Sequence, residues 1–433
     1  MAQGGCRSAG DSEVPGSRRV YVHIGEPKTG TSFLQHALWR NRAQLAAQGV
    51  VLPGYSYGGH ARASQDLREV RWQAGDPADP WIGEWDVLTG QALRTRDAAV
   101  ISNELLAACN ARQADRAVQS LLPAQVHIVV TVRDFATLLP AEWQEAVKCR
   151  GIVPWEQWLA GVIGAAPDPD RRRRLWFWTV HDTLAILALW SRHIPSDQVH
   201  VITLPPQGGT NELWLRFASA LGIESGTIDL PQGRANSSLG LAEAEFLRRL
   251  NEALPDRMPR WFYTWNVKRI LANDVLSARP AQMRLVLPPG EYAWAREQSE
   301  ILVAGLRDSK YHIVGDLAEL LPSPATEGRV PPPSLPVEDM LEVAVRATAA
   351  LADRQYRGDI ITSSSDLTVG IDPARRQPHT PGSLRRTIRR LGWAILKRSG
   401  IKPVLYRASR RPAVRNLRVL VWCILTRPGR RRG

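Results

Sequence analysis

Residues 21–35 decide the fold, and they read YVHIGEPKTGTSFLQ. The first four residues form a short apolar run that is typical of a buried strand. Two glycines and a proline interrupt this run, and residues 33–39 then have the pattern of the first turns of a helix. A strand, a glycine-containing loop and a helix N-terminus predict a phosphate-binding site, because unpaired backbone N–H groups and the helix dipole converge there.

The residues of the loop indicate which phosphate chemistry to expect. Gly25 and Gly30 have the spacing of a Gly-x-x-x-x-Gly-Lys-Ser/Thr loop, but Thr31 stands where that loop needs its lysine. The lysine is Lys28 instead, which argues against an ordinary ATPase or GTPase. The order Pro-Lys-Thr-Gly-Thr-Ser at 27–32 resembles the 5′-phosphosulfate loop of P-loop sulfotransferases, and the segment at 234–240 resembles one in actinobacterial-type members. That family uses 3′-phosphoadenosine 5′-phosphosulfate as its sulfuryl donor.

Three further apolar runs, at 98–102, 126–132 and 199–204, predict strands that are separated by helical patterns. Such alternation predicts an α/β fold with a central parallel sheet flanked by helices, and the resemblance implies a P-loop three-layer sandwich. In parallel sheets, ligands bind beyond the carboxyl ends of the strands. Glu104 and Arg133 follow two of these runs, so we expect them to share one cleft with the first loop.

The charge of the chain is distributed unevenly. The 433 residues carry a formal net charge of +14, with 56 basic and 42 acidic residues. Residues 383–433 hold 16 of the basic residues and no acidic residue, which leaves the rest of the chain with a net charge of −2. The basicity therefore belongs to a C-terminal tail, and the remainder is nearly neutral.

The tail has the pattern of a basic amphipathic helix. Leu384, Ile388, Leu391 and Ile395 lie at helical spacing, and arginines surround the other face. Because aliphatic residues and tryptophan interleave with the arginines, the pattern favours an anionic membrane surface as the partner over nucleic acid.

The remaining segments complete the predicted organisation. Residues 1–17 are polar and are expected to be disordered, residues 18–352 form the sulfotransferase-like α/β domain, and residues 353–382 form a linker to the tail at 383–433. The four scattered cysteines show no metal or redox spacing. Without a secretory signal or an apolar run of spanning length, we expect a cytoplasmic protein that is peripheral at the inner membrane face, with no metal.

The resemblance assigns the phosphosulfate site to the first loop. Lys28, the backbone of Thr29 and Gly30, and the hydroxyls of Thr31 and Ser32 would hold the 5′-phosphosulfate. A lysine there places positive charge on the oxygen that bridges phosphorus and sulfur. That oxygen gains negative charge as its bond to sulfur breaks, so the contact strengthens in the transition state.

A second set of residues matches the 3′-phosphate site of the family. Arg133 is the arginine after the third strand, and its fork suits a phosphate. Family members often carry a serine eight residues later, where this chain has Ala141. The segment Arg-Ala-Asn-Ser-Ser-Leu-Gly at 234–240 resembles a distal family segment, which implies that Arg234, Asn236 and Ser238 contact the 3′-phosphate. Simple capping of the next helix is the other interpretation of this segment.

Two residues are candidates for the base that activates the acceptor. Glu104 follows a buried strand, and several carbohydrate and tyrosyl sulfotransferases use a glutamate after the corresponding strand. His60 lies after a glycine-rich loop that would cover the site, and cytosolic members of the broader family use a histidine. Glu26 is unusual before the proline of the loop, and we expect it to point outward, because an inward carboxylate would repel the bound sulfate.

These residues predict a sulfotransferase that moves a sulfuryl group to a hydroxyl of a carbohydrate or glycolipid acceptor. The alternative is a non-catalytic nucleotide-binding or membrane-binding protein on the same fold, which the alanine at position 141 favours slightly. A different P-loop phosphotransferase is disfavoured, because Thr31 replaces the required lysine.

Overall fold

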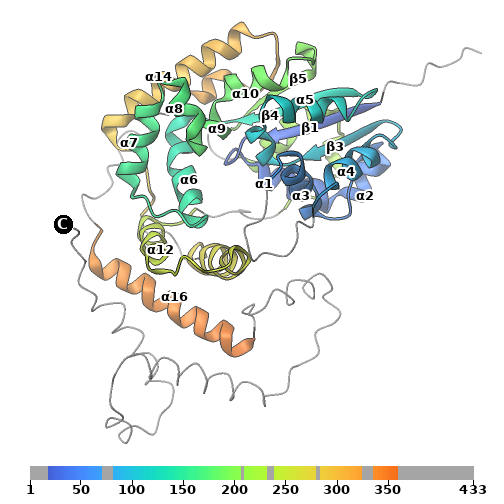
Figure 1. Ribbon diagram of the computed structural model, residues 1–433. Coiled ribbons are helices and arrows are strands. Elements are labelled where there is room, and N and C mark those ends of the chain that lie inside the picture. The colour runs from blue at the N-terminus through green and yellow to red at the C-terminus, as the bar shows by residue number, and fades with distance from the viewer. Residues whose placement is uncertain are drawn as a thin grey trace, which may run out of the picture. The chain divides into compact units, whose positions relative to one another are not determined.

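A six-stranded sheet organises the chain in the computed structural model (Figure 1). The strand order is β2-β3-β1-β4-β5-β6, and every pair of neighbours is parallel. The strands are β1 (Arg19–Gly25), β2 (Val50–Val51), β3 (Ala98–Ser102), β4 (Gln125–Val132), β5 (Val199–Thr203) and β6 (His312–Val314). The structure describes residues 18–70, 81–205, 209–231, 238–278, 283–323 and 335–358. The predicted central parallel sheet is confirmed.

Helices connect the strands and cover the sheet. The α-helices are α1 (Thr31–Arg40), α2 (Arg42–Ala47), α3 (Tyr57–Leu67), α4 (Glu84–Ala92), α5 (Ala111–Gln119), α6 (Phe135–Lys148), α7 (Trp155–Ala165), α8 (Pro169–Arg174), α9 (Trp176–His181), α10 (Thr183–Trp190), α11 (Thr210–Leu221), α12 (Leu241–Ala253), α13 (Arg260–Phe262), α14 (Pro289–Asp308) and α16 (Val337–Arg357). The shorter 3₁₀ helices are η1 (Glu104–Ala108), η2 (Ser196–Gln198), η3 (Ser225–Thr227) and η5 (Leu317–Leu320), and η4 (Tyr263–Leu276) is a π-helix. Within the described part of the chain, no helix is long and apolar enough to cross a membrane.

Apolar residues pack on both faces of the sheet, because successive side chains of a strand point to opposite sides. Val20, Val22 and Ile24 of β1 belong to the larger core cluster, which also contains buried residues of α3–α7, α9, α10, α12 and α14. Tyr21 belongs to a second cluster, which is built with α1, α2 and α11. The sheet therefore lies between two helical layers.

Some predicted boundaries are wrong. Helix α3 begins at Tyr57, so His60 lies inside a helix and not on an open loop. The first helical turn is held because the Tyr57 ring stacks on His36 and its hydroxyl donates to Gln35 Oε1 at 2.9 Å. Helices α1 and α2 are separated at Asn41, whose amide Nδ2 donates to the carbonyl of Ala37 and also to that of Asp229.

Two features near the C-terminal side also differ from expectation. Strand β6 was not predicted, because three residues are too short to show a strand period, yet it pairs in parallel with β5. Helix α16 continues to Arg357, past the expected start of the linker at residue 353. The expected N-terminal segment 1–17, the linker beyond residue 358 and the tail 383–433 lie outside the described residues, and they stay predictions.

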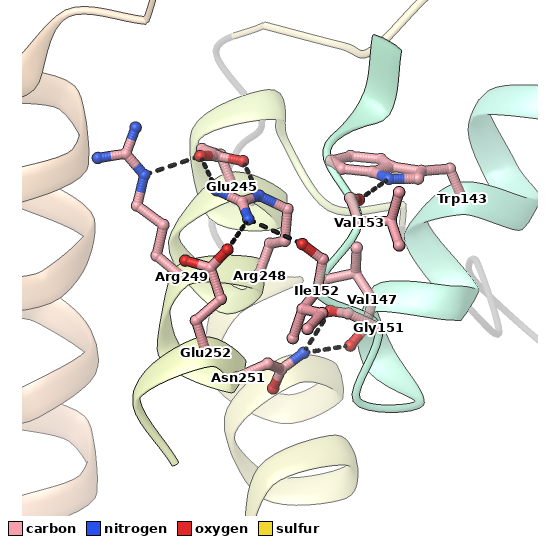
Figure 2. Close-up of polar contacts among 10 residues, drawn as sticks. All are labelled: Trp143, Val147, Gly151, Ile152, Val153, Glu245, Arg248, Arg249, Asn251 and Glu252. Atoms are coloured by element: carbon pink, nitrogen blue, oxygen red, sulfur yellow. Dashed lines mark hydrogen bonds and ion pairs between the residues drawn. The ribbon is translucent and has the colours of Figure 1, made fainter. Parts of the chain in front are cut away.

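The C-terminal end of α6 is fixed by α12, as Figure 2 shows. Asn251 Nδ2 donates to the carbonyls of Val147 and Gly151 at 2.8 and 3.0 Å. Arg248 Nη1 donates to the carbonyl of Ile152 at 2.9 Å and is paired with Glu245 through its other nitrogens. These bonds satisfy backbone carbonyls that the end of a helix leaves open, so they position the last turn of α6.

We expect Asn251→Ala to lower the free energy of unfolding by about 1–3 kcal/mol, because the carbonyls of Val147 and Gly151 each lose a donor. The amide is buried, and its Oδ1 also accepts from the hydroxyl of Tyr263 at 2.8 Å. The matched control is Arg249→Ala on the same helix, whose exposed ion pair with Glu245 is worth about 0–1 kcal/mol. Urea unfolding of both variants checks the difference, and equal losses would contradict this account of α6.

Candidate functional site

The loop between β1 and α1 turns through left-handed backbone at two glycines. Gly25 has φ +114° and Gly30 has φ +88°, a region that glycine adopts at no steric cost. A Cβ at Gly25 would lie 3.0 Å from the carbonyl oxygen of Glu104, and one at Gly30 would overlap the side chain of Leu213. Gly30 is also the N-cap of α1, and no side chain caps this helix start. The geometry leaves the first turn of α1 suited to an anion.

Thr29 holds the loop against the sheet. Its hydroxyl donates to the carbonyl of Glu26 at 2.6 Å and lies 2.5 Å from the hydroxyl of Thr131 on β4. The Glu26 N–H donates to the Thr131 carbonyl at 3.0 Å. The Thr29 side chain therefore braces the loop against β4. The other two predicted hydroxyl residues, Thr31 and Ser32, form the first turn of α1.

Lys28 has φ +61°, a left-handed conformation that is uncommon for a bulky residue. Its ammonium forms an ion pair with Glu145 Oε2 on α6, and both side chains are 26% exposed. The carbonyl of Lys28 accepts a contact from Arg133 Nη1 at 3.4 Å. Backbone strain of this kind is concentrated at functional sites. Apart from this ion pair, the ammonium makes no hydrogen bond to a described residue.

Arg133 lies beside a cavity of about 210 Å³ that runs along α6. The cavity is also lined by Ala141, where the family serine is absent, and by Ser238 and Arg284. Burial lowers the pKa of the Arg133 guanidinium, an effect that a bound anion would offset. Arg133, Ala141 and Ser238, which the sequence analysis relates to one phosphate site, therefore line one cavity in the structure.

The distal segment is anchored next to this cavity. Gln144 of α6 accepts from the Leu239 N–H at 3.0 Å and donates to the Leu239 carbonyl at 3.1 Å, which places the neighbouring Ser238 at the cavity wall. Arg234 and Asn236 lie outside the described residues, so their predicted contacts stay predictions. Arg284, which bridges to Gly240, was not predicted, because nothing in the sequence links it to the segment.

Glu104 lies where the sequence predicts it, directly after β3 and against the first loop. Its Oε2 accepts from Gln35 Nε2 of α1 at 2.8 Å, and Gln35 Oε1 accepts from the Tyr57 hydroxyl. Burial and the nearby charge of Glu104 raise the pKa of Tyr57 to about 12, so this hydroxyl stays protonated and remains a donor. The carboxylate is half-buried, and this chain of hydrogen bonds fixes its direction.

His60 is enclosed and fully bonded to the backbone. Its side chain is 2% exposed, Nε2 lies 2.8 Å from the carbonyl of Pro53, and Nδ1 accepts from the Ser102 N–H at 3.1 Å. Burial lowers the pKa of this imidazole. His60 joins the segment after β2 to the end of β3, and neither ring nitrogen is open to an acceptor.

Glu26 does not point to solvent. Its carboxylate is buried, accepts from the Thr183 hydroxyl at 2.6 Å and lies 3.3 Å from Nδ1 of His181, whose Nε2 lies 3.5 Å from Glu142. Although burial disfavours the imidazolium, the two carboxylates raise the pKa of His181 to about 9. This buried triad was not predicted, because only the folding of α9 and α10 brings these residues to the loop.

The structure adds further charged residues near Lys28. Glu145 on α6 pairs with both Lys28 and Lys268 of η4, and Lys148 lies close enough to be affected by all three charges. No spacing in the sequence connects η4 with the first loop. In the described ranges, no group of three or more His, Cys, Asp and Glu side chains is arranged to hold a metal ion.

Comparisons with known proteins give a limited result. No protein-family model matches the chain, and no curated protein matches it. A solved sulfotransferase from Alicyclobacillus acidocaldarius is similar at 16% identity and a TM-score of 0.33, over 49% of this chain and 85% of that chain. A likeness of this strength establishes neither the fold nor the function of this chain, which rest on its own residues.

The His181 triad predicts a pH-dependent stability. The folded pKa of about 9 exceeds the ordinary 6.5, so its contribution is present in full below about pH 6.5 and is lost as the pH rises through 9. His181→Gln should therefore cost on the order of 3 kcal/mol at pH 6 and much less at pH 10. Denaturant unfolding at both pH values measures this.

The matched control is His193→Gln, since the His193 side chain is 63% exposed and lies at the surface beside Asp115. It should change the free energy of unfolding by less than about 0.5 kcal/mol at either pH. A cost of His181→Gln that does not depend on pH would contradict the charged triad.

Proposed function

We propose that this protein transfers a sulfuryl group from 3′-phosphoadenosine 5′-phosphosulfate to a hydroxyl of a carbohydrate or glycolipid. The observation that carries the proposal is the 3.4 Å contact between Arg133 Nη1 and the Lys28 carbonyl. It joins a phosphate-type loop to the cavity that Arg133 lines, so the two candidate anion positions, the loop and the Arg133 guanidinium, adjoin. A nucleotide with anionic groups at both its 3′ and 5′ positions needs such a pair.

The donor would bind with its 5′-phosphosulfate on the loop and its 3′-phosphate at Arg133. The backbone N–H groups at the start of α1 and the Lys28 ammonium would hold the phosphosulfate. Ser238 would supply a hydroxyl on the cavity side, where Ala141 supplies none. Arg234 and Asn236 belong to this proposal through the resemblance alone.

The reaction is an in-line displacement at sulfur. The acceptor oxygen forms a bond to sulfur and gives its proton to a carboxylate, while the bond from sulfur to the bridging oxygen breaks. The electron pair of that bond stays on the bridging oxygen of the nucleotide. Lys28 would stabilise the charge that develops there, and no redox partner is required.

We assign the base to Glu104 in preference to His60. The Glu104 carboxylate is half-buried beside the loop and is directed by Gln35, which matches what a base needs. His60 has both ring nitrogens engaged with backbone groups.

A non-catalytic nucleotide-binding protein is the second candidate, and one observation favours it. Ala141 lines the cavity where the family serine would contact the 3′-phosphate. Both candidates bind the nucleotide, but only the enzyme loses turnover when the base is removed.

Calorimetric titration with 3′-phosphoadenosine 5′-phosphate, the product nucleotide, tests the donor site. Lys28→Ala and Arg133→Ala should each weaken binding by about tenfold to a hundredfold, because each removes a charge-assisted contact. Arg133→Ala should leave the weaker affinity for ADP unchanged, since ADP has no 3′-phosphate. Lys310→Ala, at an exposed lysine remote in sequence from the loop, is the matched control. Equal affinity for the two nucleotides would overturn the Arg133 assignment.

Sulfuryl transfer to a carbohydrate acceptor tests the base. Glu104→Gln should lower kcat by about 10²–10⁴-fold, because the amide does not take the proton. His60→Gln should lower the thermal midpoint and leave kcat of the folded protein within about threefold. The reverse pattern would move the base to His60, and unchanged turnover in both variants would leave the acceptor step without an assigned base.

A further inference from the structure

Three lysines surround one glutamate at the C-terminal end of α6. Lys28 and Lys268 contact the two oxygens of Glu145, and the Lys268 bond to Oε1 is 2.7 Å. Lys148 follows Glu145 by one helical turn and is 7% exposed. Its ammonium makes no hydrogen bond to any described residue. This cluster lies beside the first loop because Lys28 belongs to both.

The charges of the cluster do not balance. Burial, together with the charge of Lys28, lowers the pKa of Lys148 to about 8. Burial alone would raise the pKa of Glu145, but Lys28 and Lys268 hold it well below its usual range. Near neutral pH, three positive charges therefore face one negative charge. Lys148 is buried and shares the Glu145 carboxylate with two other lysines, and a bound anion would relieve the cost of this excess positive charge.

The cluster is held by the neighbouring structure. Asn251 bonds to the end of α6 at Val147 and Gly151 (Figure 2), and its Oδ1 accepts from Tyr263 at the start of η4. One side chain of α12 thus connects the two elements that carry Lys148 and Lys268. Binding to positions that are already fixed requires little reorganisation.

We propose that Lys28, Lys148 and Lys268 form a binding site for a divalent oxyanion of sulfate size. The site takes a tetrahedral anion among three ammonium groups, while Glu145 keeps Lys28 and Lys268 in place when the anion is absent. The identity of the anion rests on the proposed function. If that function holds, the anion is the sulfuryl end of the donor or an anionic substituent of the acceptor.

Titration of the full chain with inorganic sulfate tests the site without any nucleotide. Lys148→Met should weaken sulfate binding by about tenfold or more, because one charged donor is lost. Lys268→Met should weaken it similarly, and Lys310→Met, at an exposed lysine, should leave it unchanged. Glu145→Gln should strengthen it, because the internal competitor for the lysines is removed. Unchanged affinity in both Lys148→Met and Lys268→Met would overturn the proposal.

Folding does not limit this test. Lys148→Met removes a buried charge that makes no hydrogen bond to a described residue and replaces it with an apolar chain of similar length, so the variant should fold. If it does not, Lys268→Met and Glu145→Gln make opposite predictions for the same titration. A purely structural role of the cluster would not give a gain of sulfate affinity in Glu145→Gln. Loss of sulfate binding in that variant would also contradict the site.

The pH dependence gives a second readout. Sulfate affinity should fall as the pH rises from 6.5 to 9.5, because Lys148 loses its proton in this range. Four groups face Lys148. They are Lys28 of the loop, Glu145 of α6, Cys149 directly after α6, and Lys268 of η4. Burial raises the pKa of Cys149. Burial would lower the pKa of Lys268, but Glu145 raises it. As the pH rises, Lys148 therefore loses its proton before either of these residues does. The decline should be absent in Lys148→Met, and an equal decline there would contradict the assignment.

Two further titrations identify the source of the anion. If sulfate binds in the presence of 3′-phosphoadenosine 5′-phosphate but is excluded by the phosphosulfate donor, it occupies the position of the donor's sulfuryl group. Sulfate that binds together with both occupies an acceptor position. If the nucleotides do not bind and the Lys148-dependent sulfate binding persists, the proposed function fails while the anion site stands.

Discussion

Two charge contacts, one buried and one partly exposed, tie the first loop to helix α6, and the conformation of that loop depends on them. Glu26 reaches Glu142 through His181, and Lys28 pairs directly with Glu145. The two α6 glutamates are three residues apart, so they lie near one another on the helix surface. Breaking the buried contact of Glu26 with His181 costs about 3–5 kcal/mol, and the partly exposed Lys28–Glu145 pair adds a smaller contribution at the residue whose backbone is left-handed.

The sequence predicts the fold where its patterns are local. Strands β3, β4 and β5 are continuous apolar runs, and their alternation with helices correctly predicts a parallel sheet. Because carboxyl ends of parallel strands share one edge, the meeting of the loop with Glu104 and Arg133 also follows from the sequence. The resemblance to sulfotransferases led to Ser238, which the structure brings to the cavity of Arg133.

The sequence does not predict contacts that depend on packing between distant elements. Glu26 was expected to point outward, but α9 and α10 bring His181 and Thr183 to it across more than 150 residues. His60 has the composition of a loop catalyst, yet the helix that begins at Tyr57 turns it inward. The meeting of Lys268 with Glu145 depends on how η4 packs against α6, and no local spacing records that packing.

The central claim is that one nucleotide spans the loop and the Arg133 cavity. A crystal structure of the protein with 3′-phosphoadenosine 5′-phosphate tests it most directly. The account predicts the 5′-phosphate at the backbone N–H groups of residues 29–32 beside the Lys28 ammonium, and the 3′-phosphate within hydrogen-bond distance of the Arg133 guanidinium. A 3′-phosphate in solvent, or a nucleotide bound away from this loop, would contradict it.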